Sequence, residues 1–585
     1  MQVGLVEEVI RGSPICRGIA IGKLFFLNRK EFAASDTPIH PNQTEREVER
    51  YRTALARSKQ DLKRLQKQLE AESALEGILI LEAQLEMLHD PLLTEEIEKE
   101  IRITNKNAEF VFQQALFKFK DQFQALNDTF FTERFKDLQD LSRRIFSYLN
   151  ESGGQSIKDV LPHSIVCALE LTASDAAEAS SWYVGAFITE NGGATSHAAI
   201  VAKAKGIPYV TNVNLEYLKQ YPESSIIVDG RTGKIIINPG ESTLKQYENL
   251  KKKMHGQIQD FKKAAKWPAQ TFDGYTVRLT ANLDSTQELD LINQLGGSGI
   301  GLFRSEYMFL PKYEVPSEEE QFQLYYHIVE KMKELPVVIR TFDLGGDKSS
   351  LHPTNSLGRN CVIGSRTTRH LLKEKDLLKT QLRAILRASE FGNISILFPM
   401  IATLAELREA KQLVHEAAQE LKMKKIPRIG CMMEVPSACM VADHFAKECD
   451  FLSIGTNDLV QYSLAIDRSD QMLSEFYEPT DPSVIRLIKL ITGEASRLNV
   501  PVSVCGEIAS DPRFTPLLLG LGIQELSVAP RYLPIVKNAI RSVSIVDAVS
   551  LAEKALDLKT SQEILQLLVQ EYKKNVPHDL FYNIS

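Results

Sequence analysis

The sequence predicts a multidomain α/β protein: an α/β domain that carries an inserted helical bundle, followed by a (β/α)8 barrel of the TIM type. Its 585 residues suffice for several domains of ordinary size. β-type apolar runs stand on both sides of a long helix-rich stretch. After residue 270, eight short apolar runs alternate with segments of helical period, which is the pattern of repeated βα units.

The composition is that of an ordinary globular protein. With 43% hydrophobic and 25% charged residues, it excludes the disordered, collagen-like and disulfide-scaffold classes. The net charge of −7 repels nucleic acid and anionic membranes, so an anionic ligand needs a local cationic cluster.

Seven cysteines without a C-x-x-C pair suit a reducing compartment, and we expect a cytoplasmic protein. Residues 1–22 contain two Glu, and no apolar run approaches the ~18 residues of a membrane span, so neither export nor membrane insertion is expected.

The first α/β domain is predicted to consist of residues 1–28 and 151–240. Residues 1–28 have the pattern of short strands with turns, and similar runs return at 164–170, 185–190, 207–211, 225–230 and 234–238. Residues 29–150 are rich in Glu, Lys, Gln, Leu and Arg, with apolar residues at helical spacing. Because these apolar residues do not keep a strict heptad, we predict an inserted helical bundle with a surface for a partner rather than a coiled coil.

Residues 241–270 are predicted to be a helical linker, because a charged helical stretch ends at Trp267-Pro268. Residues 271–585 form the predicted barrel. Its eight β-type runs are 276–283, 299–305, 336–343, 394–401, 428–434, 450–455, 501–507 and 524–530. In such barrels the reactive side chains follow the C-terminal ends of the strands.

Polar or reactive side chains do stand at the end of almost every run. They are Asn282, Arg304, Arg340 with Asp343, Glu434, Asn457 with Asp458, and Cys505 with Glu507. The loops of any barrel are exposed to solvent and carry polar residues, so a single polar residue at a strand end does not indicate a functional site. Several arginines, acids and a cysteine together indicate an active site.

Two kinds of ligand are predicted at this site. Arg304, Arg340 and Arg366 would form a positive patch, and because guanidinium groups bind phosphate and carboxylate in bidentate fashion, the patch predicts a small polyanion. Glu434 and Asp458 follow neighbouring strands, and two carboxylates beside a phosphate site predict a divalent metal. A salt bridge between these acids and the same arginines is an equally good interpretation of the residues alone.

Two further residues are candidates for chemistry. Cys505 follows an apolar run, where a buried thiol is more often a small hydrophobic side chain; its functional interpretation is an acid that protonates a carbanion or enolate. His197 follows Gly-Gly-Ala-Thr-Ser and opens a predicted helix, so a phosphoryl group on its imidazole would face free N–H groups and the positive end of the helix dipole. A lone histidine more often caps or packs, but this run is much less common than a lone histidine.

Several motifs resemble those of the enzyme I family, the phosphoenolpyruvate-dependent phosphotransferases of the sugar phosphotransferase system. In chain order they are GGATSHAAI around His197, GIGLFRSEYMFL (299–310), RTFDLGGDK (340–348), EVPSA (434–438), FLSIGTNDLVQYSLAIDR (451–468) and VCGE (504–507). The related pyruvate phosphate dikinases and phosphoenolpyruvate synthases carry an added nucleotide-binding domain. This chain has no room for one and no P-loop.

The resemblance implies a swivelling phosphohistidine domain, an HPr-binding helical insertion and a barrel that binds phosphoenolpyruvate and forms a homodimer. It implies that His197 takes the phosphoryl group and passes it to a histidine of the carrier protein HPr. It further implies that Glu434 and Asp458 hold Mg²⁺ and that Cys505 protonates enolpyruvate. The substrate-binding residues that it implies are Arg304, Arg340, Arg366, Asn457, Arg468 and Lys348.

The sequence departs from the family pattern at two places. Cys361 replaces the usual proline after Asn360, although Gly364 and Arg366 keep their spacing, and Ala194 stands before Thr195 where the family more often has a basic residue. Neither change removes a predicted catalytic group. The alternative functions are a phosphoenolpyruvate-responsive regulatory phosphoprotein and a dikinase-like enzyme with another acceptor.

Overall fold

The computed structural model describes residues 7–27, 34–71, 75–125, 129–150, 157, 160–180, 182–193, 196–222, 224–308, 316–343, 368–466, 473 and 476–576. The chain divides into two compact units between His255 and Gly256. None of the helices in these described ranges is long and apolar enough to cross a membrane.

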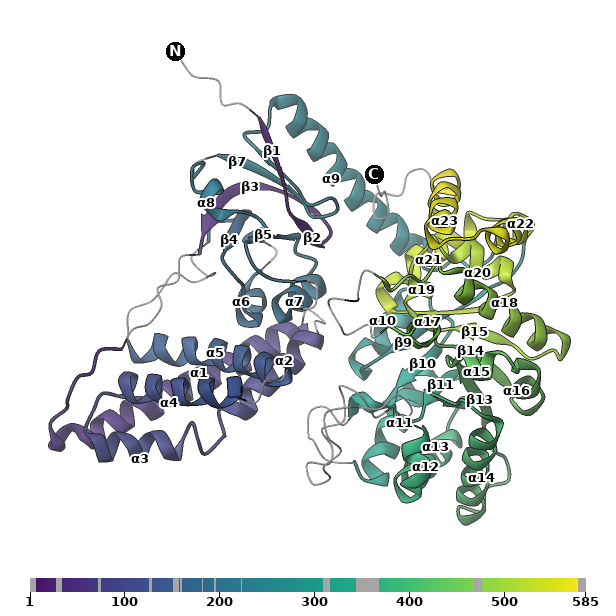
Figure 1. Cartoon of the computed structure of the whole chain (residues 1–585), viewed down its shortest axis with the longest axis horizontal. Coiled ribbons are helices and arrows are strands. Elements are labelled where there is room, and N and C mark those ends of the chain that lie inside the picture. Colours follow the sequence, from purple (N-terminus) through teal and green to yellow (C-terminus); the bar gives the residue numbers. More distant parts are fainter. Residues whose placement is uncertain are drawn as a thin grey trace. The chain divides into compact units, whose positions relative to one another are not determined.

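The first unit contains an eight-stranded mixed sheet in the order β1-β8-β7-β3-β4-β5-β6-β2 (Figure 1). Strands β3 to β6 run parallel as neighbours, whereas β1, β7 and β2 pair in antiparallel fashion. Each β-type run predicted in this unit overlaps a strand. The strands are β1 (Glu8–Arg11), β2 (Ser13–Cys16), β3 (Ile19–Phe26), β4 (Ser164–Ala168), β5 (Val184–Thr189), β6 (Tyr209–Thr211), β7 (Ser225–Asp229) and β8 (Lys234–Ile237).

Between β3 and β4 the chain forms the predicted helical insertion. Apolar side chains at helical spacing, such as Val48, Tyr51, Leu62 and Leu65 of α1, are buried where the helices pack. The helices of this unit are α1 (Thr44–Ala71), α2 (Leu75–Met87), α3 (Glu95–Thr104), α4 (Ala108–Ala125), α5 (Thr129–Leu149), α6 (Ala173–Glu178), α7 (His197–Lys205) and α8 (Leu215–Leu218). The insertion shares one hydrophobic core with α6 and α7, so it is packed against the helix that His197 begins.

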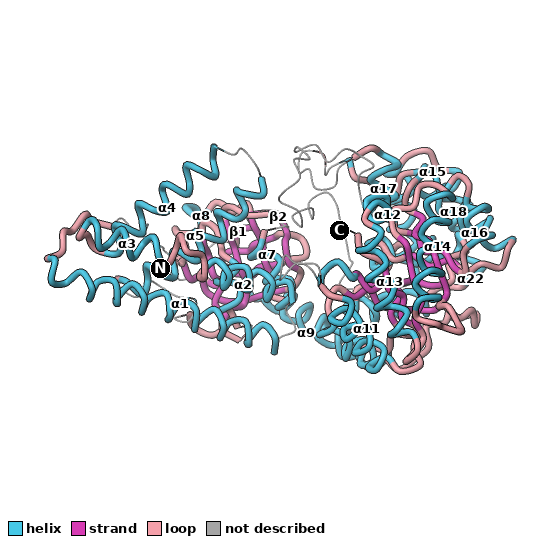
Figure 2. The backbone as a smooth tube through the Cα atoms, turned by 90° about the horizontal axis from the view of Figure 1, so that it is seen from below, coloured by secondary structure: helices cyan, strands magenta, loops and turns pink. Residues whose placement is uncertain are grey.

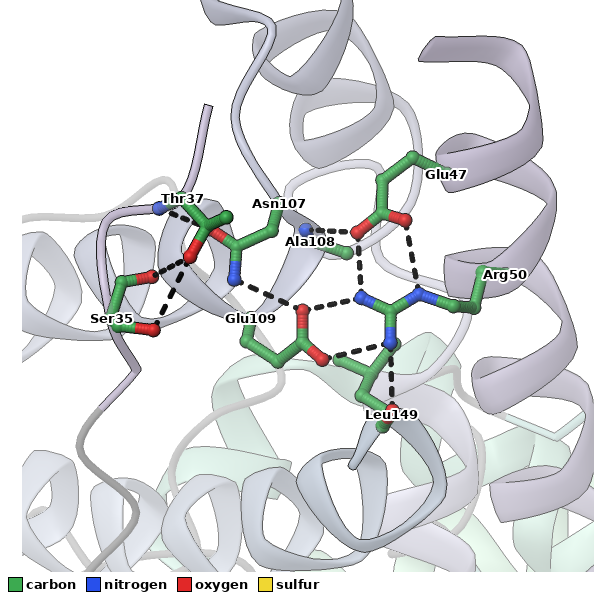
Figure 3. A network of polar contacts seen from close by, with 8 residues as sticks. All are labelled: Ser35, Thr37, Glu47, Arg50, Asn107, Ala108, Glu109 and Leu149. Atoms are coloured by element: carbon green, nitrogen blue, oxygen red, sulfur yellow. Dashed lines mark hydrogen bonds and ion pairs between the residues drawn. The ribbon is translucent and has the colours of Figure 1, made fainter. Parts of the chain in front are cut away.

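A polar network fixes the ends of three helices of the insertion (Figure 3). Glu47 of α1 accepts a hydrogen bond on Oε1 from the backbone N of Ala108, the first residue of α4, at 2.7 Å. Arg50 Nη1 donates to Glu109 Oε1 at 2.8 Å and to the carbonyl of Leu149, the last residue of α5, at 2.8 Å. The guanidinium therefore satisfies a helix-end carbonyl while it joins α1, α4 and α5.

The second unit is a closed barrel of eight parallel strands in the order β10-β11-β12-β13-β14-β15-β16-β9. Figure 2 shows these strands enclosed by helices. Each of the eight predicted runs contains one strand, which confirms the barrel prediction. The strands are β9 (Arg278–Leu283), β10 (Ile300–Arg304), β11 (Val337–Arg340), β12 (Ile394–Phe398), β13 (Arg428–Met433), β14 (Phe451–Ile454), β15 (Val502–Val504) and β16 (Glu525–Val528).

The barrel has two apolar regions. The larger one lies between strands and surrounding helices, and the smaller one fills the barrel interior with Leu302, Leu397, Met432, Phe451 and Cys505. The described helices around it are α10 (Leu289–Gln294), α11 (Glu318–Met332), α12 (Thr368–Lys373), α13 (Lys375–Ser389), α14 (Leu404–Glu420), α15 (Pro436–Cys439), α16 (Ala442–Glu448), α17 (Thr456–Leu464), α18 (Pro482–Arg497), α19 (Glu507–Ser510), α20 (Thr515–Leu521), α21 (Leu533–Arg541), α22 (Ile545–Asp557) and α23 (Ser561–Asn575).

The predicted linker contains α9 (Glu241–Ala264), and a buried lysine anchors the chain where this helix ends. Lys537 of α21 donates from Nζ to the carbonyls of Ala265 and Gly296, each at 2.7 Å. Gly296 has a φ of +71°, and a Cβ there would lie 1.8 Å from the Ala265 oxygen, so the close approach requires glycine.

Candidate active site

The mouth of the barrel, at the C-terminal ends of its strands, carries the charged side chains that the sequence predicted. Arg304 and Arg340 are the last residues of β10 and β11, and Glu434 directly follows β13. Asn457 and Asp458 lie in the first turn of α17, just after β14. Because the eight strands are parallel, these ends meet at one edge of the barrel.

Arg340 is buried at this mouth and is held between two acids. Its Nη2 forms ion pairs with Glu306 and with Oδ2 of Asp343, the latter at 3.2 Å. Burial acts to lower the pKa of the guanidinium, but the charges of Glu306, Asp343 and Glu434 outweigh it and raise that pKa. The Nε atom of Arg340 is buried and has no hydrogen-bond partner among the described residues. It is a donor suited to an anionic ligand.

The backbone around Arg340 is fixed by a buried polar network. Ser305 Oγ donates to the carbonyl of Arg340 at 2.6 Å, and Gln381 Nε2 donates to Ser305 Oγ at 2.9 Å and to Tyr325 Oη at 3.0 Å. On the other side of Arg340, the backbone N of Phe342 donates to Gln381 Oε1 at 2.9 Å. One glutamine thus supports both the strand end and the residues that follow it.

Glu434 is a buried carboxyl among other acids. Its Oε1 accepts a hydrogen bond from the backbone N of Met400 at 2.6 Å. Burial, followed by the charges of Asp458 and Asp343, raises the pKa of Glu434 well above its ordinary value. A Cβ at Gly455 would lie 2.4 Å from Glu434 Oε2, so only glycine lets this carboxyl approach the end of β14.

Glu434 and Asp458 together fit a hard divalent cation. Both offer oxygen ligands, and a cation between them would relieve the repulsion that disfavours ionisation of Glu434. In the part of the chain that the structure describes, no group of three or more His, Cys, Asp or Glu side chains could hold a metal by itself. A hard cation held by two carboxylates takes further oxygen ligands, and Mg²⁺ in particular is commonly bound by one or two carboxylates together with waters and substrate phosphates.

Two other predicted residues of the mouth have side-chain partners. Arg304 Nη1 lies 3.3 Å from Asp284 Oδ1. Asn457 forms a reciprocal pair with Glu507: Asn457 Nδ2 donates to Glu507 Oε1 at 3.1 Å, and the backbone N of Glu507 donates to Asn457 Oδ1 at 2.8 Å. This pair joins the start of α17 to the start of α19, so the two loops keep a fixed spacing.

Cys505 directly follows β15 and belongs to the buried interior of the barrel. Asn282 Nδ2 donates to its carbonyl at 2.9 Å, which fixes the backbone at this position. Burial raises the pKa of the thiol to about 11. The thiol is consequently protonated at neutral pH, which is the state that a proton donor requires.

His197 is the first residue of α7 in the first unit, and its side chain is partly buried. The helix is capped by Ser196, whose Oγ accepts a hydrogen bond from the backbone N of Ala199 at 3.2 Å. The imidazole is therefore attached at the positive end of a helix, where a phosphoryl group is favoured.

Hydroxyl groups support the turn before this helix. Thr189 Oγ1 donates to Thr211 Oγ1 at 2.9 Å, and Thr211 Oγ1 donates to the carbonyl of Gly192 at 3.4 Å. Gly192 has a φ of +131°, and a Cβ there would lie 3.1 Å from Tyr209 Oη. The turn at Gly192 therefore depends on glycine at this position.

Some predicted positions lie outside the described residues. They are the predicted substrate-binding residues Lys348, Arg366 and Arg468. The two places where the sequence departs from the family pattern, Ala194-Thr195 and Asn360–Thr367, also lie outside the described residues. Conversely, Glu306 and Asp284 are neighbours of the arginines that were not predicted from the sequence. Each follows a strand end by one or two residues, and that spacing is the signal that could have found them.

Comparisons with known proteins show to which family the chain is similar. The chain matches three family models, which are described as "PEP-utilising enzyme, N-terminal" (residues 11–134), "PEP-utilising enzyme, mobile domain" (160–233) and "PEP-utilising enzyme, PEP-binding domain" (259–545). A phosphoenolpyruvate-protein phosphotransferase of Bacillus subtilis is 34% identical over 97% of this chain and 100% of its own length. One of Mycoplasma genitalium is 35% identical over 97% of this chain and 99% of its own length.

Among solved structures, a solution structure of an enzyme I protein is 29% identical, covers 42% of this chain and 99% of its own, and has a TM-score of 0.37. The family models and the full-length relatives confirm the resemblance to enzyme I. The chain belongs to the family of phosphoenolpyruvate-protein phosphotransferases.

Proposed function

We propose that the chain transfers the phosphoryl group of phosphoenolpyruvate to His197 and then to a histidine of the carrier protein HPr, releasing pyruvate. This is the first step of the sugar phosphotransferase system. The observation that carries the proposal is the pairing, in one chain, of a barrel mouth that carries Arg304, Arg340 and the carboxyls Glu434 and Asp458 with a histidine at a helix N-terminus. An anion-binding site and a phosphoryl acceptor are the two parts that such a transfer requires.

Phosphoenolpyruvate binds at the barrel mouth in this proposal. Arg304 and Arg340, with Arg468, hold its phosphate, and Asn457 lies beside them. Arg366 and Lys348 hold the carboxylate and enolate end. Glu434 and Asp458 would hold Mg²⁺, which when bound neutralises charge on the phosphate. The buried ion pairs of Arg340 keep its guanidinium charged and oriented, so little reorganisation is needed at the moment of reaction.

The transfer step forms one bond and breaks another at phosphorus. A neutral nitrogen of His197 attacks in line, the N–P bond forms, and the bridging P–O bond breaks with its electron pair going to the enolate oxygen. The enolate is then protonated at C3 by the thiol of Cys505, which gives pyruvate. His197 and the mouth belong to different units, so the proposal requires the phosphohistidine domain to move between the barrel and HPr.

The partner assignments extend the same proposal. The insertion between β3 and β4, residues 29–150, binds HPr, and its shared core with α7 couples it to the helix that begins at His197. Residues 1–28 and 151–240 form the phosphohistidine domain, 241–270 the linker, and 271–585 the phosphoenolpyruvate-binding barrel through which two chains form a homodimer.

The test is incubation with ³²P-labelled phosphoenolpyruvate and Mg²⁺, with and without HPr. We expect an acid-labile label on the protein, because a phosphoramidate hydrolyses in acid, and transfer of that label to HPr. His197→Ala is the control and is expected to take up no label. A label that survives acid or fails to leave for HPr would contradict the proposal, the second outcome favouring a regulatory phosphoprotein.

A further inference from the structure

The inward face of β14 places a hydroxyl directly against the thiol of Cys505. Ser453 Oγ donates a hydrogen bond to Cys505 Sγ at 3.4 Å. Both residues are buried, with exposed fractions of 0% and 3%. Cys505 Sγ lies 3.6 Å from the carbonyl of Ile454 and donates to it, so the resting sulfur has one donor and one acceptor as neighbours.

The position of Ser453 follows from the barrel register. Strands β14 and β15 are parallel neighbours in which Ser453 pairs with Ser503, and the next inward residue after Ser503 is Cys505. Phe451, two residues before Ser453, packs in the same interior cluster as Cys505, which places Ser453 on the inward face. The hydroxyl therefore approaches the sulfur from inside the barrel, opposite to the mouth where the substrate binds.

We propose that Ser453 is a positioning residue for the protonation of enolpyruvate: its hydroxyl orients the Cys505 thiol and stabilises the thiolate left on Cys505. The inference rests on the proposed function. In the step, the S–H bond breaks, a C–H bond forms at C3 of the enolate, and the electron pair stays on sulfur. Water restores the proton after pyruvate leaves.

The surroundings of the sulfur make this hydrogen bond important. The interior cluster around Cys505 is apolar, and a thiolate there has lost most of its hydration. Within the described residues, no side chain other than Ser453 donates a hydrogen bond to this sulfur. Burial raises the pKa of the Cys505 thiol and the charge of Glu434 raises it further, whereas the Ser453 hydroxyl and the charges of Arg340 and Arg304 act to lower it.

A buried serine on a strand can instead serve only to satisfy the backbone, and Ser503 is an example. Its Oγ donates to the carbonyl of Leu452 at 3.5 Å. Ser453 differs because its hydroxyl donates to the sulfur. The two serines are register partners on neighbouring strands, so Ser503→Ala is a matched control for Ser453→Ala.

The first measurement is steady-state pyruvate formation with HPr as acceptor. A hydrogen bond to a charged group predicts about a tenfold to hundredfold lower kcat for Ser453→Ala, with KM for phosphoenolpyruvate changed less than about twofold. Ser503→Ala is expected to keep the wild-type kcat. If Ser453→Ala does not fold, Ser453→Thr and Ser453→Val replace it, because the two have the same shape and only Thr keeps the hydroxyl. The Val variant is then expected to be the slower by the same factor.

The second measurement does not depend on turnover. Alkylation of Cys505 by iodoacetamide, followed residue by residue with mass spectrometry over a range of pH from about 7 to 9, reports the fraction of thiolate, because only the thiolate reacts. At each pH, Ser453→Ala is expected to react about tenfold to hundredfold more slowly than the wild type. Wild-type kcat in Ser453→Ala, an unchanged alkylation profile, or an equal loss in Ser503→Ala would each overturn the inference. If the wild-type chain takes no label from phosphoenolpyruvate, the proposed function fails, while the alkylation profile still decides on the hydrogen bond.

Discussion

Glu434→Gln is expected to stabilise the metal-free protein at neutral pH although it removes a proposed metal ligand. In the folded chain, burial and the charges of Asp458 and Asp343 raise the pKa of Glu434 to about 8, from an ordinary 4.5. Between these two values the folded state holds a proton that the unfolded chain has released. Stability therefore falls as the pH rises from 4.5 to about 8.

The size of the effect follows from the two pKa values. At pH 7 the folded chain keeps this proton about 2.5 pH units above the ordinary pKa. At 1.36 kcal/mol per unit, keeping the proton lowers the free energy of unfolding by about 3 kcal/mol. Glutamine has the same shape and no proton to retain, and its amide oxygen can accept the hydrogen bond from Met400. The variant should recover up to about 3 kcal/mol at pH 7 and less than about 1 kcal/mol at pH 5.

Scanning calorimetry in EDTA at pH 5 and pH 7 measures this difference. We expect the barrel transition of Glu434→Gln to rise by several degrees at pH 7 and hardly at all at pH 5. Added Mg²⁺ should stabilise the wild type and leave the variant nearly unchanged. Glu507→Gln, which neutralises an exposed acid of the same mouth, is the control for charge alone. A variant no more stable than the wild type at pH 7, or equally stabilised at both pH values, would refute the reasoning.

Three further predictions concern the transfer reaction. His197→Ala should form no phosphoprotein and still bind phosphoenolpyruvate, because the proposed nucleophile and the proposed substrate site lie in different units. Equilibrium dialysis measures this binding, and a variant that no longer binds phosphoenolpyruvate would contradict the assignment of the two roles to different units. Residues 1–260 alone should fold and exchange phosphoryl groups with phosphorylated HPr but take no label from phosphoenolpyruvate, and direct labelling would disprove this. Cys505→Ala should lower turnover by about 10²–10⁴-fold with phosphoenolpyruvate and Mg²⁺ still bound. Phosphoenolpyruvate that is deuterated at one vinyl position and reacts in tritiated water should give pyruvate with a chiral methyl group only with the wild type. If Cys505→Ala gives the same stereochemistry, Cys505 is a packing residue and not the proton donor.

The barrel could be predicted because its signal is local and periodic. Each strand, such as β12 at Ile394–Phe398, is a short apolar run followed by a helix, and the chain repeats this unit. The ends of such strands converge whatever the intervening loops are, so Arg304, Arg340, Glu434 and Asp458 could be grouped without coordinates.

Side-chain contacts between adjacent strands could not be predicted in the same way. That Ser453 lies against Cys505 depends on the register between β14 and β15, and the two residues are 52 positions apart. The acid pair around Arg340 depends on Glu306, which belongs to the end of another strand. The contact between Ser453 and Cys505 leaves no spacing in the sequence, because parallel strands are joined by crossovers of variable length. Glu306 does follow the end of β10 by two residues, but that spacing does not show that its carboxylate pairs with Arg340 on the neighbouring strand.

The lysine anchor at the end of α9 determines where the long helix can act as a lever arm. Lys537 binds two backbone carbonyls rather than side chains, so the anchor does not depend on which side chains the linker carries. With Ala265 held to the barrel unit, any pivot must lie on the N-terminal side of it. The 24 residues of α9 then span about 36 Å at 1.5 Å per residue. In the domain movement that the proposed function requires, a tilt of the helix by about 20° at its anchored end would displace the other end by about 12 Å.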